Sequence, residues 1–86
     1  MIERLAWTLE AWTDYQYGLR QDRKTVRRIN RLVNAACRDP FSGIGKPERL
    51  KGDLAGFWSS RIDHSNRLVY VVDNETLVIL SCRFHY

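Results

Sequence analysis

The chain has 86 residues, of which 44% are hydrophobic and 28% charged, and its formal net charge is +4. This length leaves room for one domain, residues 1–86, with the composition of a globular protein. The chain has no apolar run of membrane-spanning length, no hydrophobic signal region and no CxxC spacing, which argues against a membrane protein, a secreted protein and a metal site. We therefore expect a soluble cytoplasmic domain without a cofactor, in which Cys37 and Cys82 are reduced core residues.

The first half of the chain has the pattern of one strand followed by two helices. Residues 2–7 predict a strand, and Thr8 is a suitable N-cap for a helix over residues 9–20. Asp22 predicts the cap of a second helix over residues 23–37. The expected apolar stripe of the first helix is Trp12, Tyr15 and Leu19. The expected apolar face of the second is Val26, Ile29, Val33, Ala36 and Cys37. The residues of the second helix expected to face water are Arg27, Arg28 and Arg31.

The middle of the chain is its least regular part. Residues 39–56 hold both prolines and four of the five glycines, and they show no clear period. A loop of this length in a small domain is more often functional than idle.

The last third of the chain alternates as a sheet does. Residues 57–62, 67–72 and 76–83 predict three strands, separated by the turn residues Asp63-His64-Ser65-Asn66 and Asp73-Asn74-Glu75. Strands so close in sequence form an antiparallel meander. The fold class that follows is α+β, with an N-terminal strand and two helices packed on an antiparallel sheet.

The lengths of the two turns decide which side chains share a face of this sheet. If the second turn has three residues, Val72 pairs with Thr76 and Arg67 falls opposite Ser81. Arg61 joins that face only if the first turn spans the five residues 62–66, and a four-residue turn would put it on the other side. One expected face contains Leu68, Tyr70, Val78 and Leu80. The other contains Val69, Val71, Leu77 and Ile79. Two helices cover only one face, so we expect a partner or a concave site at the second.

The basic residues are unusual in kind. Eleven of the 14 are arginine, whose planar guanidinium binds phosphate through two parallel hydrogen bonds. A small arginine-rich domain fits a nucleic-acid partner, or an acidic protein partner, better than a metabolite.

The charged groups expected near one end of the sheet suit RNA cleavage without a metal. The ribose 2′-hydroxyl must lose a proton as it attacks the phosphate, and the leaving 5′-oxygen must gain one. The reaction therefore needs a base, an acid and fixed positive charge, which a carboxylate, an imidazole and arginines supply. DNA lacks the 2′-hydroxyl and would not react. Each residue taken singly is a weak signal. The candidates are Lys46, Glu48, Lys51, Arg61, Arg67, Arg83, His85 and Tyr86.

Three stretches of the chain carry more specific motifs. Residues 40–51 read PFSGIGKPERLK, residues 56–70 read GFWSSRIDHSNRLVY, and residues 82–86 read CRFHY. In order and spacing they resemble motifs of the YoeB toxin family, a branch of the RelE-type toxins, and the likeness extends over nearly all of the chain. The resemblance implies a microbial-ribonuclease-like α+β fold and a ribosome-dependent mRNA endonuclease, the toxin of a toxin–antitoxin pair.

The resemblance also implies a role for each matching residue. Glu48 would be the general base, His85 the general acid, and Arg67 would stabilise the transition state. Arg61 and Lys51 would hold phosphate or support the stabilising charge of Arg67, and Tyr86 would shape the site and contact the RNA. The implied products are a 2′,3′-cyclic or 3′-phosphate and a 5′-hydroxyl. The implied partners are a YefM-type antitoxin, mRNA in the A site of the small ribosomal subunit, and a second copy of the chain.

Four positions depart from the family pattern. The chain has Arg49 where the family commonly has proline, Ser60 in place of an arginine, Asn66 where histidine is expected, and Phe84 in place of tyrosine. The change at Ser60 removes one possible RNA contact, and codon preference stays open. Two alternatives to the nuclease also stay open. One is a non-catalytic inhibitor of a protein target, as in ParE-type toxins, and the other is a binding module with an inactive site.

Overall fold

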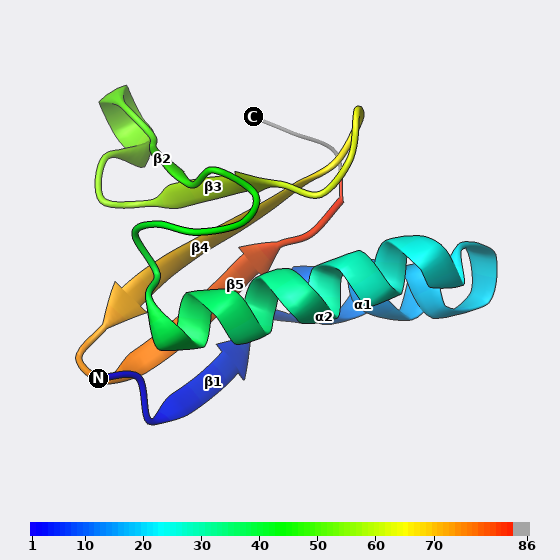
Figure 1. Ribbon diagram of the computed structural model, residues 1–86, viewed down its shortest axis with the longest axis horizontal. Coiled ribbons are helices and arrows are strands. Elements are labelled where there is room, and N and C mark those ends of the chain that lie inside the picture. Colours follow the sequence, from blue (N-terminus) through cyan, green and yellow to red (C-terminus); the bar gives the residue numbers. More distant parts are fainter. Residues whose placement is uncertain (84–86) are drawn as a thin grey trace.

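The computed structural model describes residues 1–83 and shows two helices packed on a five-stranded sheet (Figure 1). The strand order is β1-β5-β4-β3-β2, and all neighbouring strands are antiparallel except β1 and β5, which makes the sheet mixed. The α+β class and the antiparallel meander are confirmed. The elements are β1 (Arg4–Trp7), α1 (Leu9–Gln21), α2 (Arg23–Arg38), β2 (Glu48–Arg49), the 3₁₀ turn η1 (Gly52–Leu54), β3 (Trp58–Arg61), β4 (Arg67–Asp73) and β5 (Thr76–Ser81).

Both predicted helix caps are confirmed. The Thr8 hydroxyl oxygen accepts a hydrogen bond from the backbone N–H of Ala11 and donates one to the carbonyl of Leu80, which ties the start of α1 to the sheet. Asp22 accepts from the N–H of Thr25 and so caps α2. Within residues 1–83, no helix is long and apolar enough to span a bilayer.

The predicted apolar stripe of α1 is wrong at two positions. Trp12 is 46% exposed and Leu19 is 45% exposed, whereas the buried residues of α1 are Ala11 and Gly18. A Cβ atom at Gly18 would lie 2.9 Å from a methyl group of Val26. Tyr15 packs against the core as expected, while the small residues Ala11 and Gly18 are the buried ones and let the two helices approach closely.

The buried face of α2 is rotated from the predicted one. Leu32 is 2% exposed and joins Val26, Ile29, Val33 and Ala36 in the core, whereas Cys37 is only half-buried. The rotation carries Arg28 toward the sheet. The prediction that Arg28 simply faces water is therefore wrong, because its guanidinium bonds to the backbone of β3.

The predicted pairing of β4 with β5 is also wrong. The turn between them has two residues, with Asn74 at φ 58°, so Asp73 rather than Val72 lies opposite Thr76. Leu77 and Ile79 consequently share the helix-covered face with Leu68 and Tyr70, and all four are at most 1% exposed. Val78 lies opposite Val71 on the other face, where both are half-buried.

An irregularity between Val69 and Tyr70 shifts the pairing by one further residue, which returns the side chains beyond it to the faces expected from the sequence. It places Val69, not Arg67, opposite Ser81, although Ser81 still shares the face from which Arg67 projects. The first turn has the five residues 62–66, and Arg61 pairs directly with Arg67. The condition under which Arg61 and Arg67 share a face is therefore met.

Candidate functional site

The loop after α2 is fixed to the sheet by its own residues. The Asp39 carboxylate accepts hydrogen bonds from the Ser42 hydroxyl and the Phe41 N–H, at 2.6 and 3.0 Å, and these bonds lower the pKa of Asp39. The Tyr70 hydroxyl donates to the carbonyl of Pro40. The centre of the Phe41 ring lies 4.9 Å from the centre of the Trp58 ring. These contacts hold the first half of the long loop in place without regular secondary structure.

Gly45 brings the second half of the loop against β3. Its φ is +82°, and a Cβ atom there would lie 2.6 Å from a methyl carbon of Leu32. Its carbonyl accepts a hydrogen bond from the N–H of Arg61 at 2.9 Å. The chain then continues through Lys46 and Pro47 to β2. Only glycine allows this close approach, which places Lys46 and Glu48 above β3 and β4.

The short strand β2 positions Glu48 next to Arg67. Glu48 pairs with Ser59 of β3, and one carboxylate oxygen lies 2.9 Å from Nη2 of Arg67. Arg67 also donates from Nε to the Ser59 hydroxyl and from Nη2 to the Ser59 carbonyl. The Arg67 side chain is 17% exposed and that of Glu48 is 68% exposed. The guanidinium is therefore fixed from two strands, whereas the carboxylate is open to solvent.

Arg61 and Arg67 form a close pair of like charges. The N–H of Arg61 donates outward to Gly45, so the two residues occupy a non-hydrogen-bonded pair, the geometry with the shorter Cα separation of about 4.5 Å. Like charges directly opposite one another destabilise a sheet. Glu48 offsets the charge of Arg67, whereas no carboxylate of residues 1–83 lies within ion-pair distance of Arg61. An anion bound here would relieve the repulsion.

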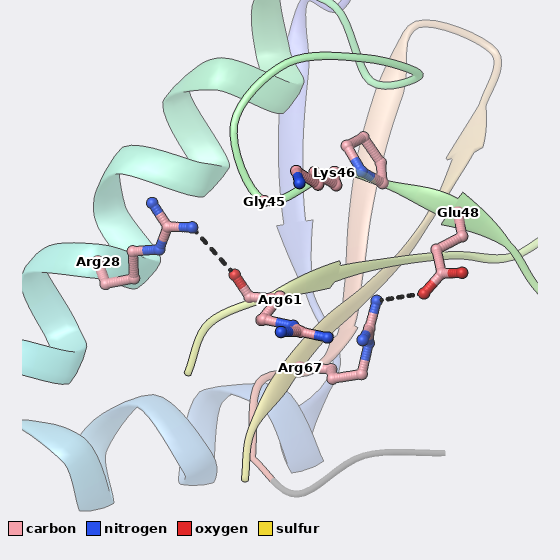
Figure 2. Close-up of a pocket in the computed structure, with 7 residues that line it drawn as sticks. Arg28, Gly45, Lys46, Glu48, Arg61 and Arg67 are labelled. Carbon is pink, nitrogen blue, oxygen red and sulfur yellow. Dashed lines mark hydrogen bonds and ion pairs between the residues drawn. The ribbon is translucent and has the colours of Figure 1, made fainter. Parts of the chain in front are cut away.

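These residues line a cleft of about 570 Å³ (Figure 2). Its four cationic side chains and one carboxylate give the lining a formal charge of 4 − 1 = +3. Four of the predicted residues, Lys46, Glu48, Arg61 and Arg67, thus meet at one place. The lining residues are Arg28, Gly45, Lys46, Pro47, Glu48, Arg61 and Arg67. Arg28 is the member that the sequence interpretation missed.

The other predicted site residues are not in this cleft. Lys51 is exposed just before η1 and does not line it. Arg83 lies in a second hollow, with its guanidinium carbon 3.7 Å from the centre of the Tyr17 ring. His85 and Tyr86 lie outside the described residues. No group of three or more potential metal ligands occurs within residues 1–83.

Three of the four departures from the family pattern lie in the described part of the chain. Ser60 is 3% exposed and lies under Gly45. Arg49 lies over the Trp58 ring. Asn66 donates to the Asp63 carboxylate, which also accepts backbone N–H groups and so organises the turn between β3 and β4. Phe84 lies outside the described residues.

Comparison with known proteins matches the chain to one family. The family described as "YoeB-like toxin of bacterial type II toxin-antitoxin system" matches residues 7–86. The chain belongs to this family. A curated YoeB toxin from Streptomyces coelicolor is 52% identical over 83 residues, which cover 96% of this chain and 99% of the relative. The YoeB-like fold and the resemblance stated from the motifs are thereby confirmed.

Solved structures agree with this membership. A YoeB/ParE toxin from Agrobacterium tumefaciens has a TM-score of 0.95 and 49% identity, and the match covers 98% of this chain and 100% of that one. A YoeB dimer from Staphylococcus aureus has a TM-score of 0.91 and 41% identity, and it covers 100% of both chains. A YoeB–YefM complex from the same organism has a TM-score of 0.89 and 40% identity, and it covers 100% of this chain and 99% of that one.

The side chains in the cleft of this YoeB-like toxin can accept a proton and can bind anions. The exposed Glu48 carboxylate can accept a proton, and the fixed Arg67 guanidinium can donate hydrogen bonds to an oxyanion beside it. The surplus of cations favours a ligand with more than one negative charge. A phosphodiester chain is such a ligand.

Proposed function

We propose that this toxin is an mRNA endonuclease that acts on the ribosome and cleaves by acid–base catalysis without a metal. The observation that carries the proposal is the Glu48–Arg67 ion pair, an exposed carboxylate held 2.9 Å from a fixed guanidinium in a cleft with surplus positive charge. A base and a group that stabilises the phosphorane must lie side by side for this reaction, and this pair fulfils that requirement.

In the proposed reaction, Glu48 removes the proton of the ribose 2′-hydroxyl as that oxygen attacks the adjacent phosphorus. The bond from phosphorus to the 5′-oxygen breaks, and His85 donates a proton to the departing oxygen. The products are a 2′,3′-cyclic phosphate and a 5′-hydroxyl. Arg67 and Arg61 bind the extra negative charge of the phosphorane, which forms between the two proton transfers.

The remaining candidate residues support RNA binding in this proposal. Lys46 lines the cleft and attracts the phosphodiester chain. Lys51 and Tyr86 contact the RNA, as the family resemblance implies. Arg83 lies in the second hollow with its guanidinium over the Tyr17 ring, so we propose that it contributes to the site only indirectly.

The partners follow from the relatives. The Staphylococcus aureus relatives include a YoeB dimer and a YoeB–YefM complex. We propose that the present toxin likewise forms a homodimer and is held inactive by a YefM-type antitoxin. Its substrate is mRNA in the A site of the small ribosomal subunit, so its place of action is the cytoplasm.

The test is primer extension on mRNA that is being translated in the presence of the purified toxin. We expect Glu48→Gln and His85→Gln each to lower the cleavage rate by about 10²–10⁴-fold, because each removes one proton-transfer group. Glu75→Gln is the matched control for the first, since Glu75 is an exposed carboxylate in the turn at the other end of β4. His64→Gln, in the exposed turn before β4, is the control for the second.

Three outcomes would contradict the proposal. Undiminished cleavage by either variant would remove that residue from the mechanism. Ribosome binding by the wild-type toxin without new 5′-hydroxyl ends would favour a non-catalytic inhibitor or binding module. EDTA kept below the Mg²⁺ concentration removes transition metals and leaves ribosomes intact, so a loss of cleavage under this condition would contradict the metal-free route.

A further inference from the structure

We propose that Arg28 forms a second phosphate site in the cleft, for the phosphate next to the scissile one in a single-stranded RNA. The inference rests on the proposed function, since it assumes that the cleft binds RNA. It names a binding residue on α2, a helix that contains none of the candidates expected from the sequence.

The position of Arg28 separates it from the proposed reaction centre. Its Nη2 atom lies 3.3 Å from the carbonyl oxygen of Arg61, to which it donates a hydrogen bond. Figure 2 shows Arg28 approaching from α2 on one side of Arg61, whereas Arg67 and Glu48 lie on the other. A phosphate at the Glu48–Arg67 pair and a phosphate at Arg28 would therefore be different groups of the same chain.

The hydrogen bonds of Arg28 leave most of its donors available. A guanidinium has five N–H donors, and within residues 1–83 the single bond of this side chain is the one to the Arg61 carbonyl. Within the same residues, no carboxylate lies within ion-pair distance of it. The bond to β3 holds the side chain at the cleft and reduces the entropy that a ligand must overcome to order it.

The surplus positive charge of the cleft also favours the binding of a second phosphate. Arg67 is offset by Glu48, which leaves Arg28, Lys46 and Arg61 as the surplus cations. One phosphodiester has a single negative charge and cannot neutralise three. A neighbouring phosphate of the same strand brings the next charge, and Arg28 is the surplus cation on the far side of Arg61 from the reaction centre.

The neighbouring residue supplies a matched control. Arg27 is exposed on the same helix and does not line the cleft, because successive residues of a helix point about 100° apart. Arg27→Gln and Arg28→Gln change the net charge of the protein equally. Any difference between them therefore reports the position of Arg28 and not the overall charge.

The test is an NMR titration of the purified toxin with two oligonucleotides that have 2′-O-methyl sugars and hydroxyl ends. The dinucleotide has one phosphate and the trinucleotide has two. We expect Arg28→Gln to weaken trinucleotide binding by about fivefold to tenfold at low salt and dinucleotide binding by less than about twofold. We expect the slope of log K against log salt for the trinucleotide to fall by about 0.7, the value for one phosphate contact on a single strand. Arg27→Gln should change neither affinity by more than about twofold.

The other outcomes would overturn the proposal. Equal losses with the two ligands would place Arg28 at the same phosphate as Arg67, or make it a support of β3. If Arg27→Gln weakened trinucleotide binding as much as Arg28→Gln does, the loss of affinity would come from the change in net charge alone. A wild-type toxin that binds the trinucleotide no better than the dinucleotide would show that no second site exists. The 2′-O-methyl ligands cannot be cleaved, so these results are independent of whether Glu48 and His85 act as proposed.

Discussion

The cleft and the second hollow, around Arg83, use arginine in opposite ways. In the cleft, Arg28, Lys46 and Arg61 have no carboxylate partner within residues 1–83, and only Arg67 is paired. In the second hollow, Arg83 lies over the Tyr17 ring, and the lining includes the carboxylates Asp14 and Asp22. The formal charge of the first lining is +3, and that of the second is 1 − 2 = −1.

The polar groups of the second hollow are engaged inside the protein. The Asp14 carboxylate accepts a hydrogen bond from the backbone N–H of Cys82, and the Asp22 carboxylate caps α2. Burial, with a smaller contribution from Asp14, raises the pKa of the Cys82 thiol to about 12, so the thiol stays neutral at physiological pH. Positive charge is therefore concentrated at the cleft, whereas the lining of the second hollow is net negative.

The largest effect expected from the contrast between the two hollows separates Arg67 from Arg83. We expect Arg67→Gln to lower the rate of mRNA cleavage by about 10²–10³-fold, the usual loss when one fixed donor to a transition-state oxyanion is removed. Arg83→Gln should lower it by less than about tenfold, because the Arg83 guanidinium is stacked on Tyr17 away from the cleft. Primer extension at equal toxin concentration measures both. A loss of about 10²-fold in Arg83→Gln would contradict this difference and would place Arg83 in the catalytic site.

The sequence sufficed for those features that depend on local chemistry. Thr8 and Asp22 are caps because their side chains reach N–H groups only three residues away. The register between β4 and β5 depends instead on whether the turn at Asp73-Asn74-Glu75 uses two residues or three. The left-handed backbone of Asn74 produces a two-residue turn. The difference of one residue in turn length moves Leu77 and Ile79 to the opposite face of the sheet.

The same distinction applies to the site. Glu48, Arg61 and Arg67 were predictable because they lie in motifs on a hairpin and the strand beside it. Arg28 was missed because Leu32 was left out of the apolar face of α2. Arg28 precedes Leu32 by one helical turn, so the correct face would have placed it at the border of the core. That this border meets β3 depends on Gly45 packing on Leu32, a long-range contact that no local pattern encodes.

The next largest effect tests the loop that builds one wall of the cleft. We expect Gly45→Ala to lower the free energy of unfolding by about 2–4 kcal/mol, because the methyl group would collide with Leu32 and the backbone is left-handed. Gly43→Ala should cost only about 1 kcal/mol, since Gly43 also has a positive φ but a Cβ atom there meets nothing within 4 Å. Urea unfolding of both variants measures the difference. Equal losses would mean that the approach of the loop to Leu32 contributes no stability.

The smallest expected effect concerns the repulsion between Arg61 and Arg67. An anion that binds only the folded cleft stabilises it by RT ln(1 + [L]/Kd), about 1 kcal/mol when inorganic phosphate is several-fold above its Kd. For a domain of this size that corresponds to a rise in Tm of about 4–8 °C relative to chloride at equal ionic strength. Arg61→Gln should lose most of this rise and, in dilute chloride, should be no less stable than the wild type, because it removes one of two facing charges. Arg83→Gln should retain the full rise. If phosphate instead stabilises both variants equally, it acts on the whole surface and the contrast between the two hollows does not extend to anion binding.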